Sequence, residues 1–435
     1  MRRDRTRTRA AAMAGSLLTA AGVVAGCSSE ADNVVTLYYA LEQYVPHIVA
    51  TCNEEANGEY QIVHRQLPRD ADGQREQMVR RLAAGDTDLD LLGLDVTWVP
   101  EFAEAKWLAE WTGEDKASVE EDTLEVPLKT ATWDGKLYAA PMNTNVQLLW
   151  YDKSLTPEPP KTWEEMIEMS RDLKAQGKPY QILYTGAQYE GLVVAFNSLV
   201  NSAGGQVLSD DGTEVTLDDK ARRALEIMRQ MVDEGLNSPS LSNAQEQQVV
   251  DSFSPGDSQA AFQINWPFVY AATRDAKSPR FENLAWTTYP GVGDNPGRVT
   301  VGGFNIAVSA YSEKKDLAFK AARCLRQAKN QKYAAICGGV PPTLESLYKD
   351  EEPIAPCDGD TSGKRQSMVD AYPMRDDILK SLETAAVRPL TPVYQNLSTV
   401  TSKILSPPGS IDPQATLEEL REELNNAVQS QGVLP

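Results

Sequence analysis

The order of strand-like and helix-like segments in residues 34–107 limits the fold more than any other feature of this chain. Segments rich in β-branched, aromatic or apolar residues occur at Val34–Tyr39, Tyr60–Gln66 and Leu89–Leu94. Between and after them, apolar residues at helical spacing occur in His47–Ala56, Gln74–Ala84 and Trp98–Trp107. This repeated strand-helix order predicts a parallel sheet covered by helices on both faces.

The rest of the chain continues as a mixture of helices and strands. Helices are predicted from the capping box of Thr162 and Glu165 toward Gly177, and over Glu190–Ser202, Lys220–Gly235, Glu313–Lys329 and Leu417–Val428. Strands are predicted at Lys136–Ala140, Gln147–Tyr151 and Arg298–Val308. A length of 435 residues favours two domain-sized units.

The N-terminus has the pattern of a secretory signal. Five arginines and one aspartate in the first nine residues precede an uncharged, apolar run from Ala10 to Gly26. That run is shorter than a membrane-spanning helix requires. The tetrad ending at Cys27, Val-Ala-Gly-Cys, resembles a lipobox, so residues 1–26 are interpreted as a lipoprotein signal peptide and Cys27 as the lipidated residue. Residues 27–33 then form a tether, and a multiply acylated cysteine holds the protein on a membrane. The alternative is an ordinary signal peptide with a cysteine nearby.

Net charge and residue counts exclude several kinds of partner. The net charge of −20 disfavours binding to phosphate backbones, so no nucleic-acid partner is expected. The only histidines are His47 and His64, which almost excludes a zinc site built on histidine. Beyond Cys27 there are four cysteines, an even number that suggests two disulfides with three connectivities open. No metal site and no cofactor are predicted.

Motifs of common enzymes give no sign of catalysis. The chain contains no GxSxG nucleophile elbow. Its glycine-rich segment, Gly291–Gly297, has the wrong spacing for a phosphate loop and is interpreted as a turn. A glycosidase would need a pair of carboxylates, but no pair can be distinguished among 62 acidic residues. The remaining classes are an extracellular hydrolase, a solute receptor for a transporter, and an adhesive or assembly protein.

Aromatic and polar residues at predicted strand ends indicate binding of a polyhydroxylated ligand. Asp95 and Trp98 follow the strand ending at Leu94, where ligands of parallel sheets bind. Asn143, Asn145 and Gln147 follow another predicted strand, and Trp266 precedes a proline. Aromatic rings pack against the C–H faces of sugars, and carboxylates and amides bind hydroxyls. Each has a plain structural alternative: Asp95 as a helix cap, Trp266 as core, and the asparagines as turn residues.

Several long segments resemble one protein family over most of the chain. They are AGDTDLDLLGLDVTWVPEFAEA, KLYAAPMNTNVQLLWY, EGLVVAFNSLVNSAGGQVLSDDG, NWPFVY, VTVGGFNIAV and AAVRPLTPVYQNLS. The chain is similar to the substrate-binding lipoproteins of carbohydrate ABC importers, and among them to the actinobacterial trehalose-binding lipoproteins of trehalose-recycling importers. The resemblance implies an α/β periplasmic-binding-protein fold with two lobes, hinge crossings and a ligand cleft between the lobes. It implies a non-enzymatic protein that captures a disaccharide, with maltose or sucrose as alternatives to trehalose and a glycosidase as a more distant one.

The resemblance also implies a set of ligand-binding residues. Glu246, Gly303 and Arg388 join Asp95, Asn145 and Trp266, with Trp266 as the stacking platform and Gly303 as a point where the backbone approaches the sugar. Glu42 and Gln43 compete for an acidic role after the first strand, and Glu42 is preferred. From the sequence alone, Glu246 would be a solvated acid and Arg388 part of a surface salt bridge.

The implied lobes divide the chain at three crossings. Residues 34–141 and 299–339 form lobe 1, and residues 142–298 and 340–435 form lobe 2. The implied disulfides are Cys52–Cys324 within lobe 1 and, as the remaining pair, Cys337–Cys357. The implied partners are ABC permease subunits and the extracytoplasmic face of the cell membrane, which a monomer would reach through its lipid anchor.

Overall fold

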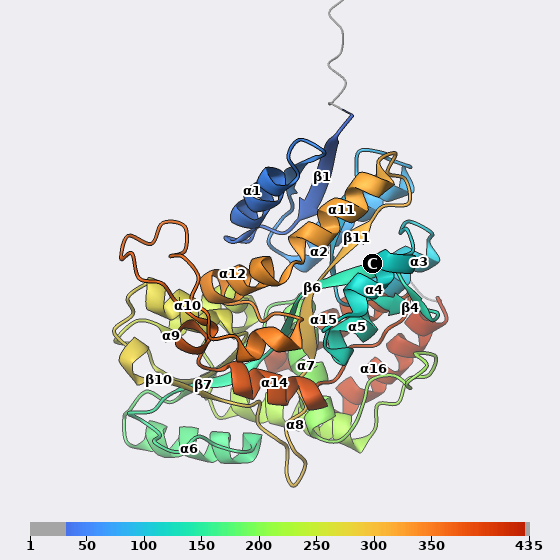
Figure 1. The fold of residues 1–435 in the computed structure, drawn as a ribbon. Coiled ribbons are helices and arrows are strands. Elements are labelled where there is room, and N and C mark those ends of the chain that lie inside the picture. Colours follow the sequence, from blue (N-terminus) through green and yellow to red (C-terminus); the bar gives the residue numbers. More distant parts are fainter. Residues whose placement is uncertain (1–31, 431–435) are drawn as a thin grey trace, which may run out of the picture. The chain divides into compact units, whose positions relative to one another are not determined.

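Two β-sheets, each with its own hydrophobic core, organise the described part of the chain (Figure 1). The structure is a computed structural model that describes residues 32–430, so the predicted signal peptide and Cys27 lie outside the described residues. The first sheet has five strands in the order β2-β1-β3-β11-β6, and the second has four in the order β10-β7-β9-β8; a small additional sheet consists of β4 and β5 alone. The predicted mixed α/β architecture with two lobes is confirmed.

The strands are short and most are buried. Their bounds are β1 Val34–Tyr39, β2 Gln61–Gln66, β3 Leu91–Asp95, β4 Thr132–Trp133, β5 Lys136–Leu137, β6 Ala139–Val146, β7 Leu148–Asp152, β8 Gln181–Leu183, β9 Ala260–Asn265, β10 Leu284–Thr287 and β11 Val301–Val308.

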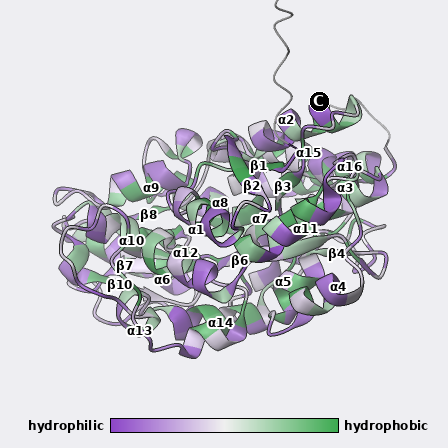
Figure 2. Ribbon diagram, turned by 45° about the horizontal axis from the view of Figure 1, so that its top comes forward, coloured by the Kyte–Doolittle hydropathy of each residue, from purple (hydrophilic) through white to green (hydrophobic). Residues whose placement is uncertain are grey.

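Helices cover the sheets and join their strands. Their bounds are α1 Val45–Glu55, α2 Ala71–Ala83, α3 Val99–Glu104, α4 Gly113–Glu120, α5 Glu125–Thr130, α6 Trp163–Ala175, α7 Glu190–Ser202, α8 Asp219–Asp233, α9 Glu246–Phe253, α10 Phe268–Asp275, α11 Lys315–Leu325, α12 Ala328–Gly338, α13 Met368–Ala371, α14 Arg375–Thr384, α15 Tyr394–Leu405 and α16 Pro413–Val428. Four short 3₁₀ turns occur at Leu241–Asn243, Phe281–Asn283, Glu345–Lys349 and Pro408–Ser410. Many helices carry a hydrophobic and a hydrophilic side (Figure 2), as expected of helices that cover a core.

The first sheet differs from the parallel sheet that the strand-helix order predicts. Strand β1 pairs in parallel with β2 and β3, as expected. Strand β11, which comes from far later in the chain, pairs antiparallel with both β3 and β6. The sheet is therefore mixed, because a late strand inserts between two early ones, and local periodicity carries no information on such an insertion.

A second difference is a break in the helix predicted over Glu313–Lys329, which the structure divides into α11 and α12. At the break, the buried guanidinium of Arg326 donates to the carbonyls of Ser118 (2.8 Å) and Val119 (3.2 Å). The side-chain amide of Gln331 donates to the carbonyl of Arg326 (2.8 Å). The break is thus accompanied by side-chain hydrogen bonds to a segment far away in the sequence, which helical spacing alone could not reveal.

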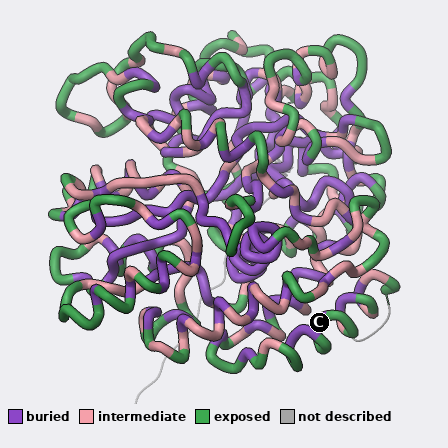
Figure 3. Tube along the Cα trace, turned by 90° about the horizontal axis from the view of Figure 1, so that it is seen from below, coloured by how far each residue is buried: buried purple, intermediate pink, exposed green. Residues whose placement is uncertain are grey.

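The chain passes from one hydrophobic core to the other at three places. One core contains residues of β1, β3 and α11, and the other contains residues of β7, β9 and α7. In chain order, core membership changes between Met142 and Val146, again between Val301 and Ile306, and again between Ala334 and Ala335. Helix α7 is buried along its whole length. Figure 3 shows buried segments in the interior and exposed segments at the periphery.

Two disulfides have the connectivity that the family resemblance implies. Cys52 of α1 is bonded to Cys324 of α11, and Cys337 of α12 is bonded to Cys357. The first closes a loop across 272 positions and joins two helices that contact each other. The second ties the end of α12 to the segment before α13. Both predicted pairings are therefore present in the structure.

Within residues 32–430, none of the helices has the length and apolar character needed to cross a bilayer.

Candidate ligand-binding site

The carboxyl end of β3 meets a buried arginine from the C-terminal part of the chain. Asp95, the last residue of β3, accepts a hydrogen bond from Nη2 of Arg388 at 3.0 Å, although the two residues are 293 positions apart. Arg388 is held there because the backbone of Ala386 pairs with Val299 and Val301 next to β11. An ion pair thus connects the end of a strand in one core with a segment packed on the other core.

Arg388 is embedded in a cluster of polar side chains at the start of α7. Its Nη1 donates to Oε1 of Glu190, which also accepts from the hydroxyl of Tyr394 (2.6 Å). The other oxygen of Glu190 accepts from the hydroxyl of Ser398. Only 2% of the Arg388 side chain is exposed. Arg388 therefore belongs to a buried network of hydrogen bonds and ion pairs. Sequence reasoning without the resemblance had instead predicted a surface salt bridge for it.

Burial and neighbouring charges set the protonation of this cluster. Burial alone would lower the pKa of Arg388, but the charges of Asp95 and Glu190 outweigh burial and raise it. Burial raises the pKa of Glu190, and the charge of Arg388 opposes that rise. A cation between carboxylates is thus the stable arrangement in this low-dielectric place.

A second group of predicted residues lies around the end of β9. The backbone N–H of Trp266 donates to Oδ1 of Asn265 (2.9 Å), and the side-chain amide of Asn265 donates to the carbonyl of Glu246 (3.0 Å). Burial and the nearby charge of Glu246 raise the pKa of Tyr189. Because Tyr189 directly precedes Glu190, the group of Trp266 and Glu246 is continuous with the Arg388 cluster.

Strands β6 and β11 connect this group with β3. Asn145 on β6 is opposite Gly302 on β11, and a Cβ atom built on Gly302 would lie 2.9 Å from the Cη2 atom of Trp266. The missing side chain of Gly302 therefore gives space to the indole. The next residue, Gly303, has a φ of +127°, and a Cβ there would lie 2.4 Å from the carbonyl oxygen of Asn143. Backbone geometry alone requires glycine at Gly303.

Glu42 occupies the loop between β1 and α1, on the other side of Asn143. The side-chain amide of Asn143 donates to the hydroxyls of Tyr39 (3.2 Å) and Tyr44 (3.1 Å). Burial raises the pKa of Glu42 to about 7, and the charge of Arg69 opposes the rise. Burial raises the pKa of both tyrosines, and the charge of Glu42 adds to the rise.

Several buried polar atoms in this neighbourhood have no hydrogen-bond partner within residues 32–430. They include Oγ1 of Thr144, Oδ1 of Asn145, Oε1 of Gln147 and Nε of Arg388. Buried polar atoms are normally satisfied. A ligand with many hydroxyl groups could both donate to the oxygens and accept from the Nε–H group, so these atoms are suited to a polyol.

The structure tests the plain alternatives of the sequence analysis. Oδ1 of Asp95 does accept from the N–H (3.0 Å) and hydroxyl (2.8 Å) of Thr97, so it stabilises the local turn as well as pairing with Arg388. Asn143 and Asn145 lie within β6, so their interpretation as turn residues is wrong. Trp266 is partly exposed rather than part of a core.

Sequence reasoning missed the residues that support Arg388. Glu190 appeared only as the start of a predicted helix, and Tyr394 only inside the quoted segment AAVRPLTPVYQNLS. Their role depends on contacts across 198 and 204 positions, which no local pattern shows. The polar pair Tyr189-Glu190 directly before the apolar run of residues 191–196 was the available signal.

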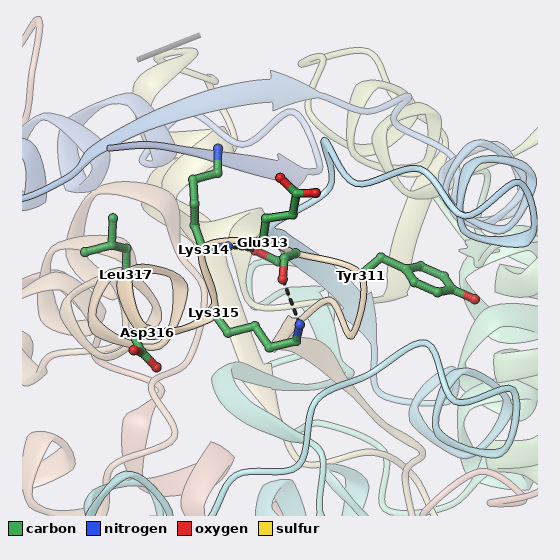
Figure 4. A pocket seen from close by; sticks show the side chains of 7 residues that line it. Tyr311, Glu313, Lys314, Lys315, Asp316 and Leu317 are labelled. Carbon is green, nitrogen blue, oxygen red and sulfur yellow. Dashed lines mark hydrogen bonds between the residues drawn. The ribbon is translucent and has the colours of Figure 1, made fainter. Parts of the chain in front are cut away.

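A surface depression of about 600 Å³ lies elsewhere, at residues 311–317 (Figure 4). The side chains of Tyr311 and Leu317 point away from each other there. The hydroxyl of Ser312 donates to Oδ1 of Asp90 (2.6 Å), which places the depression at the start of β3 rather than at its carboxyl end. None of the predicted ligand-binding residues lines it.

No group of three or more histidine, cysteine, aspartate or glutamate side chains in the described residues is placed to hold a metal ion. The chemistry of the cluster is that of hydrogen-bond donors, acceptors and an aromatic face.

Comparisons with known proteins define the class. Residues 55–332 match the family of bacterial extracellular solute-binding proteins, and the chain belongs to that family. It is 28% identical over 307 residues to a probable ABC transporter-binding protein of Deinococcus radiodurans, covering 66% of this chain and 70% of that protein. It is also 28% identical over 269 residues to the diacetylchitobiose binding protein DasA of Streptomyces coelicolor, covering 59% of this chain and 61% of DasA.

Solved structures confirm the periplasmic-binding-protein fold. Maltose-bound MalE3 of T. maritima superimposes with a TM-score of 0.79 at 24% identity, covering 90% of this chain and 98% of MalE3. The GacH receptor of Streptomyces glaucescens, solved unliganded and with acarbose, superimposes with a TM-score of 0.74 at 17% identity, covering 92% of this chain and 99% of GacH. At these identities the likeness concerns the fold.

Proposed function

We propose that this chain is an extracytoplasmic solute-binding lipoprotein that captures a disaccharide, with trehalose as the first candidate, and delivers it to an ABC import permease. Maltose and sucrose are the alternative ligands. The protein acts by binding and release and leaves the sugar chemically unchanged.

The observation that carries the proposal is the ion pair between Asp95 and Arg388. It joins the end of β3 to a segment packed on the other core, and the same guanidinium also binds the carboxylate of Glu190. Strand β11, which pairs with β3, has Asn145 opposite its Gly302 and the partly exposed indole of Trp266 against that glycine. Carboxylates accept hydrogen bonds from hydroxyls, and a guanidinium fork donates to neighbouring oxygens. An indole face packs against sugar C–H groups.

The proposed roles follow from these chemistries. Asp95 and Glu246 accept from sugar hydroxyls, Arg388 donates to them, and Trp266 stacks on one ring. Glu42 from lobe 1 and Asn145 from the boundary strand β6 complete the set, and the backbone at Gly303 approaches the ligand. Closure of the lobes, 34–141 with 299–339 and 142–298 with 340–435, would be driven by contacts that improve in the closed state.

Calorimetry of the mature protein against trehalose, maltose, sucrose and glucose tests the proposal. Saturable binding of a disaccharide, recovered intact after long incubation, is the expected result. Hydrolysis or transfer products would instead indicate a glycosidase, and no binding to any of these sugars would refute the proposed function.

The variant Trp266→Ala tests the stacking role. We expect at least about tenfold weaker binding, because an aromatic contact contributes roughly 1 kcal/mol beyond the area it buries. Trp286→Ala is the matched control: Trp286 is also partly exposed, but it lies on β10 and packs on Trp150 and Tyr270. Equal affinity losses in the two variants would contradict the role of Trp266.

Cys27 is the proposed attachment point of the lipid anchor, and the anchored protein is proposed to act as a monomer. Metabolic labelling with a palmitate analogue should label the wild-type protein and leave Cys27→Ser unlabelled. Label retained by the variant would contradict the anchor site.

A further inference from the structure

We propose that Glu190 is a positioning residue that sets the orientation of the Arg388 guanidinium for ligand binding. The inference rests on the proposed function, because it concerns the same site. Glu190 would not touch the sugar itself; it would act through Arg388.

The contacts of Glu190 fix its carboxylate on three sides. It lies at the first position of α7, and 11% of its side chain is exposed. One oxygen accepts from Arg388 and from the hydroxyl of Tyr394 (2.6 Å), and the other accepts from the hydroxyl of Ser398. Both hydroxyls come from α15, so two elements hold this carboxylate in place.

The orientation of Arg388 follows from these contacts. Glu190 accepts a hydrogen bond from Nη1 of the guanidinium, and Asp95 accepts one from Nη2. The Nε atom has no hydrogen-bond partner in the described part of the chain. Without Glu190, the planar fork would turn to bind Asp95 through two parallel hydrogen bonds, the geometry that an arginine and a carboxylate prefer. Asp95 would then have fewer lone pairs available to accept from a ligand.

The charge at this position also suits the end of the helix. The N-terminus of α7 carries a partial positive charge that favours a carboxylate, and the charge of Arg388 favours the ionised form of Glu190 as well. One cation then lies between two carboxylates, and neither carboxylate is left buried and unpaired.

A purely structural ion pair is the competing explanation, and the chain contains a matched control. Asp152 at the end of β7 pairs with Arg280 (3.6 Å), and the side chains are 8% and 7% exposed. This pair joins β7 to the segment after α10. Asp152 is four residues from Leu148, which pairs with Asn265 next to Trp266, so it lies roughly 13 Å further along the strand.

The experiment compares Glu190→Gln with Asp152→Asn by sugar titration calorimetry and thermal melting. Both variants are expected to melt below the wild type. Glu190→Gln is expected to weaken binding of the best disaccharide about 10- to 100-fold, the effect of losing one charge-assisted hydrogen bond. Asp152→Asn is expected to bind like the wild type.

A double-mutant cycle separates positioning from general destabilisation. In an Arg388→Gln background, Glu190→Gln should weaken binding no further, because its effect passes through Arg388. Additive losses would overturn the inference, as would unchanged affinity of the single variant Glu190→Gln.

Milder variants cover the case in which Glu190→Gln does not fold. Tyr394→Phe and Ser398→Ala each remove one hydrogen bond to the carboxylate of Glu190 and keep the Arg388 ion pair. Each should weaken binding about two- to tenfold. If the wild type binds disaccharide and both of these variants bind equally well, the positioning role is refuted; if the wild type binds none, the proposed function itself fails.

Discussion

Glu42 gives the sharpest test of the site, through the pH dependence of stability. Burial of its carboxylate raises the pKa from the usual value near 4.5 to about 7, and the charge of Arg69 opposes the rise. An acid with a raised pKa binds its proton more tightly in the folded state than in the unfolded one. Its contribution to stability is therefore complete below about pH 4.5 and is lost as pH rises through 7.

The size of the effect follows from the shift. At about 1.4 kcal/mol for each pKa unit, a rise of this size corresponds to roughly 3 kcal/mol of unfolding free energy between pH 4.5 and 7. Glu42 is partly exposed, and solvent screening makes this figure an upper bound. The variant Glu42→Gln is neutral throughout and should lose this part of the pH dependence.

Chemical denaturation of the wild type and of Glu42→Gln, at a series of pH values from 4 to 8.5, measures the difference directly. The wild type should lose stability relative to the variant as pH rises, with the change centred between 4.5 and 7. A stability difference that is constant across this range would show that the carboxylate is not buried beside Tyr39 and Tyr44, and Glu42 would leave the proposed site.

The same group predicts how binding depends on pH. If Glu42 accepts hydrogen bonds from sugar hydroxyls, the ligand favours the ionised form and lowers its pKa. Affinity should then increase as pH rises through 7, and binding at pH 7 should release protons, which calorimetry detects by comparing buffers of different ionisation enthalpy. Proton uptake on binding would contradict an acceptor role for Glu42.

Two further predictions concern the disulfides and the indole. Removing the bond between Cys52 and Cys324 should lower the free energy of unfolding by about 5 kcal/mol or more in the chain-entropy picture, because it closes a loop across 272 positions. Removing the bond between Cys337 and Cys357, which spans 20 positions, should lower it by about 3 kcal/mol. A larger drop in the denaturant midpoint for the second variant than for the first would contradict this order. Gly302→Ala should weaken sugar binding if Trp266 stacks on the ligand, because the added Cβ would lie 2.9 Å from the indole and such overpacking costs about 1–3 kcal/mol. Calorimetry showing unchanged affinity would contradict this prediction.

Local patterns predicted the elements whose signals are local. The strand Val34–Tyr39 and the helix Glu190–Ser202 have the predicted bounds, because β-branched content and the spacing of apolar residues are properties of the segment itself. Strand β9, which carries Trp266 at its end, was not predicted. Its run Ala260–Asn265 is fully buried and lacks the alternation that marks a half-buried strand.

The candidate site could be predicted only where a resemblance supplied the long-range information. Without it, Arg388 was a surface cation and Glu246 a solvated acid, since an isolated charged residue in a sequence has no visible partner. The partners of Arg388 come from β3, α7 and α15. What decides its role is the tertiary fold that assembles these elements.

The placement of the Asp95–Arg388 pair bears on how such a protein would close. A buried ion pair contributes little net stability, because the cost of removing both charges from water nearly cancels their attraction. A pair that joins segments packed on different cores would therefore stabilise the contact between the lobes only weakly. It would still define their relative position, because a hydrogen-bonded ion pair requires a specific geometry. A sugar that adds hydrogen bonds to the same two side chains offsets their desolvation, so that closure depends on the ligand rather than on the protein alone. On this balance, charged residues are useful at such a boundary: an apolar contact of the same size would close the lobes without ligand, and binding of the sugar would then change the population of the closed form little.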